Sequence, residues 1–340
     1  MKRGFTFLFC FLAGLTVFSQ AGRPYAIWED QSLGVYRYVR LDASSGSKTN
    51  ISVIPGIAGF VAGNATAYNS VTDQYHFTAV NGSGQLIFYT LGRITGAIIY
   101  NPFLQHNLVG IEYNPADSLL YALRINTTTY DIVTLDPATG ADTLVISCGN
   151  FTGYVAGSFC LNTQLQHYSF IVLNASTYFL RTFDLATGLM IANNSFPDNV
   201  VGHRYSCLDN AVYGLWEVNN VYTLEQIDQL SGAHTTVDTL ASVTPGFVTE
   251  SYSVNTTGNY TFRGFDAGNN FALFTIDLAN AAIIASASTN DNAVGFEEPG
   301  FCAGTTLVNN LHEEYLKNIF PVPATDKLFI RTTSKKIKKI

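Results

Sequence analysis

Five ionisable side chains recur near the starts of regularly spaced apolar segments: Glu112, His203, Arg204, Glu250 and Glu297. Carboxylates that converge on one point offer the oxygen ligands that calcium prefers, so calcium is the cofactor that would suit this set. Glu250 or Glu297 would otherwise act as a general base while Arg204 stabilises a developing anion. The plainer interpretation is that these groups are solvated strand ends.

Short catalytic motifs do not accompany these residues. The chain has no His-Glu-x-x-His, Gly-x-Ser-x-Gly, phosphate-binding glycine loop or Cys-x-x-Cys pair. Asn64 and Ser158 occupy the corresponding places in two further segments. The five ionisable residues are therefore candidates for ligand binding, and no catalytic residue is assigned.

A turn signature recurs along the chain with a mean spacing of 47 residues. The repeat units that it marks must position the five candidate residues. The clearest copy of the signature is Leu-Asp-Pro-Ala-Thr-Gly at residues 135–140, and similar copies begin at Leu41, Phe183 and Ile227. A copy at Leu91 lacks the Asp, and another at Ile276 lacks the Gly. In such turns Asp accepts backbone N–H bonds two residues on, and Gly adopts the left-handed conformation.

Each repeat unit contains four short strands. In the clearest unit we expect them at residues 109–113, 119–125, 130–135 and 141–146. Four antiparallel strands in about 47 residues are typical of one blade of a β-propeller. First strands begin at steps of 45 to 47 residues, near Gly63, Val109, Ala156, Val201, Val248 and Val294.

The two ends of the repeat region complement each other. Residues 294–298 supply a first strand with no later strands, whereas residues 25–28 and 35–42 supply later strands without a first. Joining them gives a composite blade that removes free sheet edges. The sequence therefore predicts an all-β, six-bladed β-propeller over residues 22–302. A seventh blade would need a unit for which the even spacing leaves no room.

Composition fits this fold and excludes one class of partner. Hydrophobic residues make up 47% of the chain and charged residues only 13%, so Asn, Thr, Ser, Gly and Tyr must form the polar surface. Residues 22–315 carry 24 acidic and 9 basic residues, a balance of −15. Without a basic stripe we expect no nucleic-acid partner.

The first 21 residues have the order of a signal peptide. Lys2 and Arg3 precede an apolar run at residues 5–18, and Ser19 and Ala21 are the small residues before a cleavage site. Phe9 before Cys10 argues against a lipid anchor there. No later stretch reaches the roughly 18 apolar residues of a membrane helix. We expect an exported protein that begins at Gly22 and has no transmembrane segment.

Four cysteines remain after that cleavage, at positions 148, 160, 207 and 302. Oxidation in an exported protein allows three pairings, which the sequence does not distinguish. Cys148 with Cys160 closes the shortest loop and is the first expectation, with buried free thiols as the alternative.

The turns resemble those of the YVTN and quinoprotein propeller families, whose blades carry similar Asp-x-x-Thr-Gly turns. Quinoproteins also have tryptophans that dock neighbouring blades. Only Trp28 and Trp216 occur in this chain, so we do not expect a quinone cofactor.

The C-terminal segment, residues 317–340, follows an expected linker at residues 303–316 and resembles the start of the type IX secretion (Por system) sorting domain of Bacteroidetes. Pro321, Pro323, Ala324, Asp326 and the apolar residues 328–330 fit that pattern, whereas Val322 stands where the family has Asn. Family members continue for several more strands, so this domain looks truncated. The resemblance implies that secretion machinery is a partner, through the signal peptide and the tail.

Two functions follow as hypotheses. The first is a secreted or cell-surface propeller that binds an extracellular ligand, as an adhesion protein does, without catalysis. The alternative is a metal-dependent, lactonase-like hydrolase with its site at the mouth of the propeller channel. The geometry of the channel mouths discriminates between them.

Overall fold

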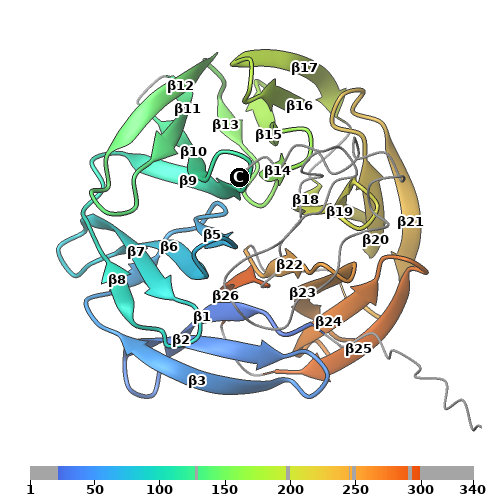
Figure 1. Ribbon diagram of the computed structural model, residues 1–340. Coiled ribbons are helices and arrows are strands. Elements are labelled where there is room, and N and C mark those ends of the chain that lie inside the picture. Colours follow the sequence, from blue (N-terminus) through green and yellow to red (C-terminus); the bar gives the residue numbers. More distant parts are fainter. Residues whose placement is uncertain are drawn as a thin grey trace, which may run out of the picture.

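The computed structural model describes residues 22–126, 129–196, 200–244, 246, 250–289 and 293–298, and all regular structure within them is β-strand. The strands form six antiparallel sheets that surround one axis like blades (Figure 1). The chain is therefore a six-bladed β-propeller, as the repeat predicts. The expected signal peptide, linker and sorting-domain tail lie outside the described residues.

The first three blades in chain order are built from residues 59–196. Blade 1 contains β4 (Gly59–Phe60), β5 (Thr66–Asn69), β6 (Gln74–Val80), β7 (Leu86–Gly92) and β8 (Ile98–Tyr100). Blade 2 contains β9 (Asn107–Asn114), β10 (Leu119–Ile125), β11 (Tyr130–Leu135) and β12 (Asp142–Gly149). Blade 3 contains β13 (Gly153–Tyr154), β14 (Cys160–Asn162), β15 (His167–Asn174), β16 (Thr177–Asp184) and β17 (Leu189–Phe196).

The remaining three blades complete the ring. Blade 4 contains β18 (Val201–Ser206), β19 (Ala211–Val218), β20 (Val221–Ile227) and β21 (His234–Leu240). Blade 5 contains β22 (Tyr252–Val254), β23 (Asn259–Phe265), β24 (Phe271–Asp277) and β25 (Ala282–Ser288). Blade 6 contains β26 (Ala293–Glu297), β1 (Tyr25–Asp30), β2 (Val35–Asp42) and β3 (Ser47–Ile54).

Blade 6 is the predicted composite. Its innermost strand β26 comes from the far end of the repeat region and pairs antiparallel with β1, with Ala293 opposite Trp28 and Val294 opposite Ile27. β1 in turn pairs with β2 along its whole length. Figure 1 shows the red β26 beside the blue β1, which closes the ring.

Burial separates the middle strands from the outer ones. β6, β7 and β24 each have five consecutive buried residues, because neighbouring blades cover both faces of a middle strand. The outermost strand β25 instead alternates between exposed and partly buried residues. Apolar side chains between adjacent blades thus form the core, while the blade rims carry the polar surface.

The predicted turn chemistry is confirmed. Asp136 Oδ1 accepts the amide of Ala138 at 2.9 Å, and Asp42, Asp184, Asp228 and Asp277 accept the amide two residues on in the same way. Gly140 is left-handed, with φ of 72°. In the blade 5 turn that lacks Gly, Ala281 adopts the same conformation, with φ of 58°.

This alanine leads to a stability prediction. A left-handed conformation costs an L-residue with a Cβ about 1–2 kcal/mol, so Ala281→Gly should stabilise the protein by about 0.5–1 kcal/mol after the added chain entropy. Ala279→Gly in the same turn is the matched control and should give no gain. Chemical denaturation measures both, and a loss of stability in Ala281→Gly would contradict the argument.

The first residues of the innermost strands differ most from the bounds that the sequence predicts. Those of blades 1, 3 and 5 begin at Thr66, Cys160 and Tyr252, three or four residues later than predicted. Left-handed residues precede them and hold the chain out of the sheet ladder. The short strands β4 and β13, which the sequence does not predict, pair with β6 and β15 before these turns.

The expected Cys148–Cys160 disulfide is wrong. Both thiols are free and buried, whereas Cys207 is disulfide-bonded. Cys148 lies on the outermost strand of blade 2 and Cys160 on the innermost strand of blade 3. A short loop in sequence therefore spans the full radial depth of a blade, and the two thiols face different cores.

Candidate functional site

Six buried left-handed residues surround the propeller axis, one on each blade. They stand on an innermost strand or just before it, and their φ angles lie between 54° and 88°: Asn64, Gly110, Gly157, Gly202, Glu250 and Gly295. Four are glycine, the residue that adopts this conformation without steric cost. Asn tolerates it, but Glu250 is an unusual occupant.

Backbone hydrogen bonds across this ring join the blades in pairs. The amide of Gly110 in blade 2 donates to Gly63 in blade 1 at 2.6 Å, and His203 in blade 4 donates to Gly157 in blade 3 at 2.9 Å. Gly295 in blade 6 donates to Glu250 in blade 5 at 2.6 Å. Three two-blade units result.

Buried tyrosines connect one pair to the next. The hydroxyl of Tyr260 in blade 5 donates to the carbonyl of Gly202 in blade 4 at 2.6 Å. Tyr168 donates to Gly110, and Tyr75 to Gly295, in the same way. All three rings are fully buried, so backbone and tyrosine contacts alternate around the channel and tie every blade to both neighbours.

Asn64 bridges the channel. Its side-chain amide donates to the carbonyl of Phe159 in blade 3 at 3.2 Å, and its side-chain oxygen accepts the hydroxyl of Tyr252 in blade 5. Its backbone amide donates to Glu250 Oε1 at 2.9 Å. Three non-adjacent blades are thus held together at the axis.

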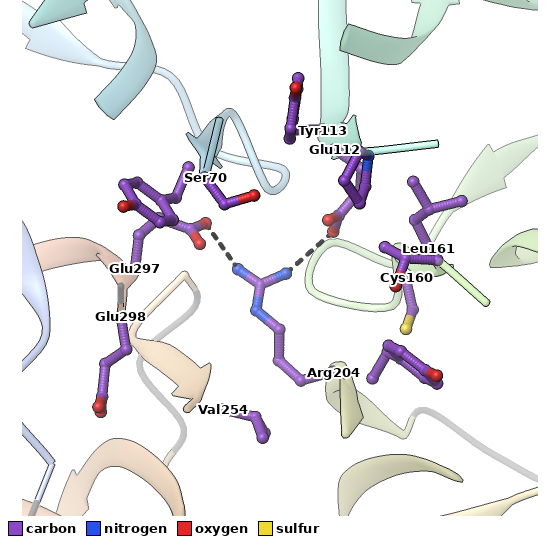
Figure 2. A pocket seen from close by; sticks show the side chains of 13 residues that line it. Ser70, Glu112, Tyr113, Cys160, Leu161, Arg204, Val254, Glu297 and Glu298 are labelled. Carbon is purple, nitrogen blue, oxygen red and sulfur yellow. Dashed lines mark hydrogen bonds and ion pairs between the residues drawn. The ribbon is translucent and has the colours of Figure 1, made fainter. Parts of the chain in front are cut away.

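Three predicted candidates meet at one end of the channel, which we call the strand-end mouth. Arg204 donates to Glu112 Oε1 at 3.0 Å and to Glu297 Oε1 at 3.1 Å. Figure 2 shows the guanidinium reaching between the two carboxylates. Thr66 also donates to Glu297 Oε1 at 3.1 Å, and the Tyr252 ring lies 4.8 Å beneath the guanidinium.

Burial and the shared guanidinium act in opposite directions on the two carboxyls of this triad. The side chains of Arg204, Glu112 and Glu297 are only 11%, 19% and 15% exposed. Burial raises the pKa of Glu112 to about 8, with Arg204 opposing and Glu297 reinforcing the rise. Burial also raises the pKa of Glu297, against the pull of Arg204. Burial thus favours the protonated form of both carboxyls, whereas the guanidinium that they share favours their charged form.

The triad does not fit a calcium ion. Arg204 already supplies the positive charge between the two carboxylates, where a shared cation would have to sit. Calcium needs six to eight oxygen ligands, and no group of three or more His, Cys, Asp or Glu is gathered for a metal within the described ranges. These carboxylates therefore act here as partners of arginine.

The strand-end mouth opens into a cavity of about 120 Å³. Tyr68, Tyr113 and Tyr205 line it beside the triad, together with the buried Glu298. Glu298 points away from Arg204 in Figure 2 and accepts hydrogen bonds from Ser253 at 3.3 Å and Asn255 at 3.0 Å.

Glu250 lies apart from the triad, at the opposite strand-start mouth. It is 4% exposed and lines a cavity of about 260 Å³ with residues of blades 6 and 1. Oε1 accepts the Asn64 amide, whereas Oε2 has no hydrogen-bond partner among the described residues. Burial raises the pKa of Glu250 to about 8, although the amides of Asn64 and Ala65 and the charge of Arg204 oppose the rise.

His203 belongs to neither mouth. Its ring is fully buried, packs edge-on against Phe196, and has no partner for either nitrogen among the described residues. Burial lowers its pKa to about 3. His203 is thus a neutral core residue. Ser158 is also structural, because its hydroxyl donates to Val155 and accepts the amide of Ile171.

These buried groups predict a stability optimum in mildly acidic solution. Folded Glu112 and Glu250 hold protons up to about pH 8, whereas a free Glu releases its proton near 4.5. The folded state binds more protons in that window, so stability falls as pH rises through it. Folded His203 and His76 stay neutral down to about pH 3, below the ordinary 6.5, so stability also falls with acid.

Thermal unfolding from pH 3 to 9 tests this prediction. Each group changes the free energy of unfolding by about 1.4 kcal/mol per pH unit inside its window, so the melting temperature should peak between about pH 4.5 and 6.5. A melting temperature that stays constant from pH 6 to 9 would contradict the prediction, because Glu112 and Glu250 would then ionise without destabilising the folded state.

Comparisons with known proteins place the chain by fold. No family model matches it, and no curated protein sequence does. TolB from Acinetobacter baumannii aligns with a TM-score of 0.55 and 11% identity, over 82% of this chain and 67% of that one. A chain of a nidogen/laminin complex aligns with a TM-score of 0.55 and 10% identity, over 82% of this chain and all of the other.

An enzyme is also among the similar structures. Puromycin hydrolase aligns with a TM-score of 0.51 and 13% identity, over 79% of this chain and 47% of that one. Identities this low show a shared propeller fold and leave function to the site itself. No helix in the part of the chain that the structure describes is long and apolar enough to span a membrane.

Proposed function

We propose that this chain is an exported binding protein, located outside the cell or on its surface, whose propeller recognises an extracellular ligand without transforming it. The predicted signal peptide at residues 1–21 and the sorting-domain resemblance at residues 317–340 support export and the secretion machinery as a partner. The acidic, sparsely charged body is consistent with an extracellular protein and argues against binding to nucleic acid.

One observation supports the absence of catalysis most strongly: the polar groups of the Arg204 triad bind each other, and so do those around the Asn64 side chain. Arg204 is shared by Glu112 and Glu297, and Asn64 bridges to Phe159 and Tyr252. A catalytic carboxylate needs an open position beside it for the reacting atom. At the strand-end mouth that position holds the guanidinium of Arg204.

A second candidate function, a lactonase-like hydrolase, is favoured by Glu250. This carboxyl combines a free Oε2, a raised pKa and a cavity, which are features of a general acid or base. It lacks a nearby described Arg, His or Lys in the cavity lining to stabilise an anion. We therefore rank binding above hydrolysis.

Turnover assays separate the two. The chain starting at Gly22 should not hydrolyse aryl esters, γ- and δ-lactones or aryl glycosides above the buffer rate, with or without calcium or zinc. Hydrolysis that disappears in Glu250→Gln but persists in Glu217→Gln, an exposed glutamate on β19, would overturn the binding proposal.

A further inference from the structure

The cavity at the strand-start mouth has an unusual lining. Ile27 and Val294 form aliphatic walls, Tyr36 and Phe60 contribute aromatic rings, and Glu29 and Glu250 contribute carboxylates, in about 260 Å³. That volume lies just below the roughly 300 Å³ at which sites for drug-sized ligands begin. The occupant would therefore be small.

Glu250 is held there against two energetic penalties. It is a non-glycine residue at φ of 65°, at a place where four other blades have Gly, and its carboxyl is 4% exposed with Oε2 unpartnered among the described residues. Backbone strain and an unsatisfied buried carboxyl each persist in proteins mainly where they serve a ligand or a reaction. Glycine would remove both penalties, although it would also remove the hydrogen bond that Oε1 accepts from the Asn64 amide.

The chemistry of the lining selects a cation with an apolar body. The ionisable groups besides Tyr36 are two carboxyls, so the lining offers an anion no positive partner. Two carboxylates among apolar walls do not supply the six to eight oxygens that calcium takes. An ammonium group would satisfy Oε2 with a charge-assisted hydrogen bond, while aromatic faces attract the cation and cover its hydrocarbon part.

We propose that the strand-start cavity binds the primary ammonium group of a small apolar amine or lysine side chain, with Glu250 as its buried counter-ion and Tyr36 and Phe60 as the aromatic walls. This inference rests on the proposed binding function and names the ligand class of one mouth. Glu250 Oε2, which lines this cavity and has no hydrogen-bond partner among the described residues, is the atom that the ammonium group would contact.

Calorimetric titration of the chain starting at Gly22 tests the proposal. Benzylammonium and Nα-acetyl-lysine-N-methylamide are the ammonium probes, and benzyl alcohol is the neutral match to the first. We expect at least one of the two ammonium probes to bind. If benzylammonium binds, benzyl alcohol should bind at least tenfold more weakly. The probe preferred shows whether a free amine or a lysine side chain is the source.

Variants then assign the binding to Glu250. Glu250→Gln should weaken the ammonium probe at least tenfold, and Glu217→Gln should leave it unchanged. Glu250→Gly should abolish binding, and its melting temperature shows whether the chain still folds, because the variant removes the backbone strain and the buried carboxyl but also the acceptor of the Asn64 amide. No binding of either probe, or unchanged binding in Glu250→Gln, would overturn the site. Turnover assays are independent of this result, so failure of the site and failure of the non-catalytic function are distinguishable.

Discussion

Replacing Arg204 with methionine should destabilise the propeller by about 3–5 kcal/mol, the usual cost of removing one partner from a buried ion pair. Arg204 is the cation between Glu112 and Glu297, and each carboxylate comes from a different blade. Without the guanidinium, two buried carboxyls face each other in a small cavity with no cation between them. Urea-induced unfolding at pH 7 measures the loss.

Two control variants test whether the loss of stability in Arg204→Met comes from the ion pairs of the triad. Arg40→Met, on the exposed side of β2, should change stability by no more than about 0.5 kcal/mol. Adding Glu112→Gln and Glu297→Gln to Arg204→Met should recover much of the loss, because no buried charge is then left unpaired. A loss below about 1 kcal/mol in Arg204→Met would mean that solvent screens the triad and that it does not hold the blades together.

The second large effect concerns the N-terminus. A chain that begins at Gly22 should be more stable near pH 7 than one carrying extra residues before Gly22, by about 2–3 kcal/mol. The Gly22 nitrogen lies 3.3 Å from Thr275 Oγ1 in a buried position. A Cβ built on Gly22 would lie 2.6 Å from Glu298 Oε1, so the glycine sits against that carboxylate.

Glu298 explains the expected gain. It is 9% exposed, burial raises its pKa, and it has no ion-pair partner within the described ranges. Cleavage after residue 21 would turn the neutral Gly22 amide into an ammonium group beside this carboxyl. Melting temperatures of the Gly22 chain and of its Nα-acetylated form measure the difference, and Glu298→Gln should abolish it. Equal melting temperatures in the Glu298 background would refute the pairing.

Much of the fold follows from local turn chemistry that the sequence displays. β10 and β11 have their predicted bounds because Asn- and Asp-capped turns define both ends of the hairpins. The composite blade follows from the missing strands at the two ends. Starts of the inner strands were less predictable, since left-handed residues such as Glu250 give no apolar periodicity to detect.

The candidate site was predicted only in part, because equal spacing along the chain does not say which mouth a side chain reaches. Glu112, Arg204 and Glu297 are separated by 92 and 93 residues, which is two blades, so they occupy equivalent places on alternate blades. Glu250 belongs to the other set of blades and faces the other mouth.

The sequence does contain a signal that distinguishes the two sets of alternate blades. Tyr-x-Phe begins at Tyr75, Tyr168 and Tyr260, on the blades whose tyrosines bond the preceding blade. At the equivalent places on the second strands of blades 2 and 4, Tyr121 and Tyr213 begin Tyr-x-Leu, and their hydroxyls instead bond Asp117 and Asp209. Tyr-x-Leu also begins at Tyr89, Tyr178 and Tyr222, so only Tyr-x-Phe distinguishes the two sets of blades. The bridging role of Asn64 has no such signal, because it depends on contacts with blades that are distant in sequence.

A crystal structure of the chain starting at Gly22, grown in millimolar calcium, tests most directly the claim that the carboxylates of the strand-end mouth are structural and not catalytic. The predicted result is Arg204 within hydrogen-bond distance of both Glu112 and Glu297, with no metal between them. Calcium coordinated by Glu112 and Glu297, with the guanidinium of Arg204 displaced, would contradict the account and favour the metal-dependent hydrolase.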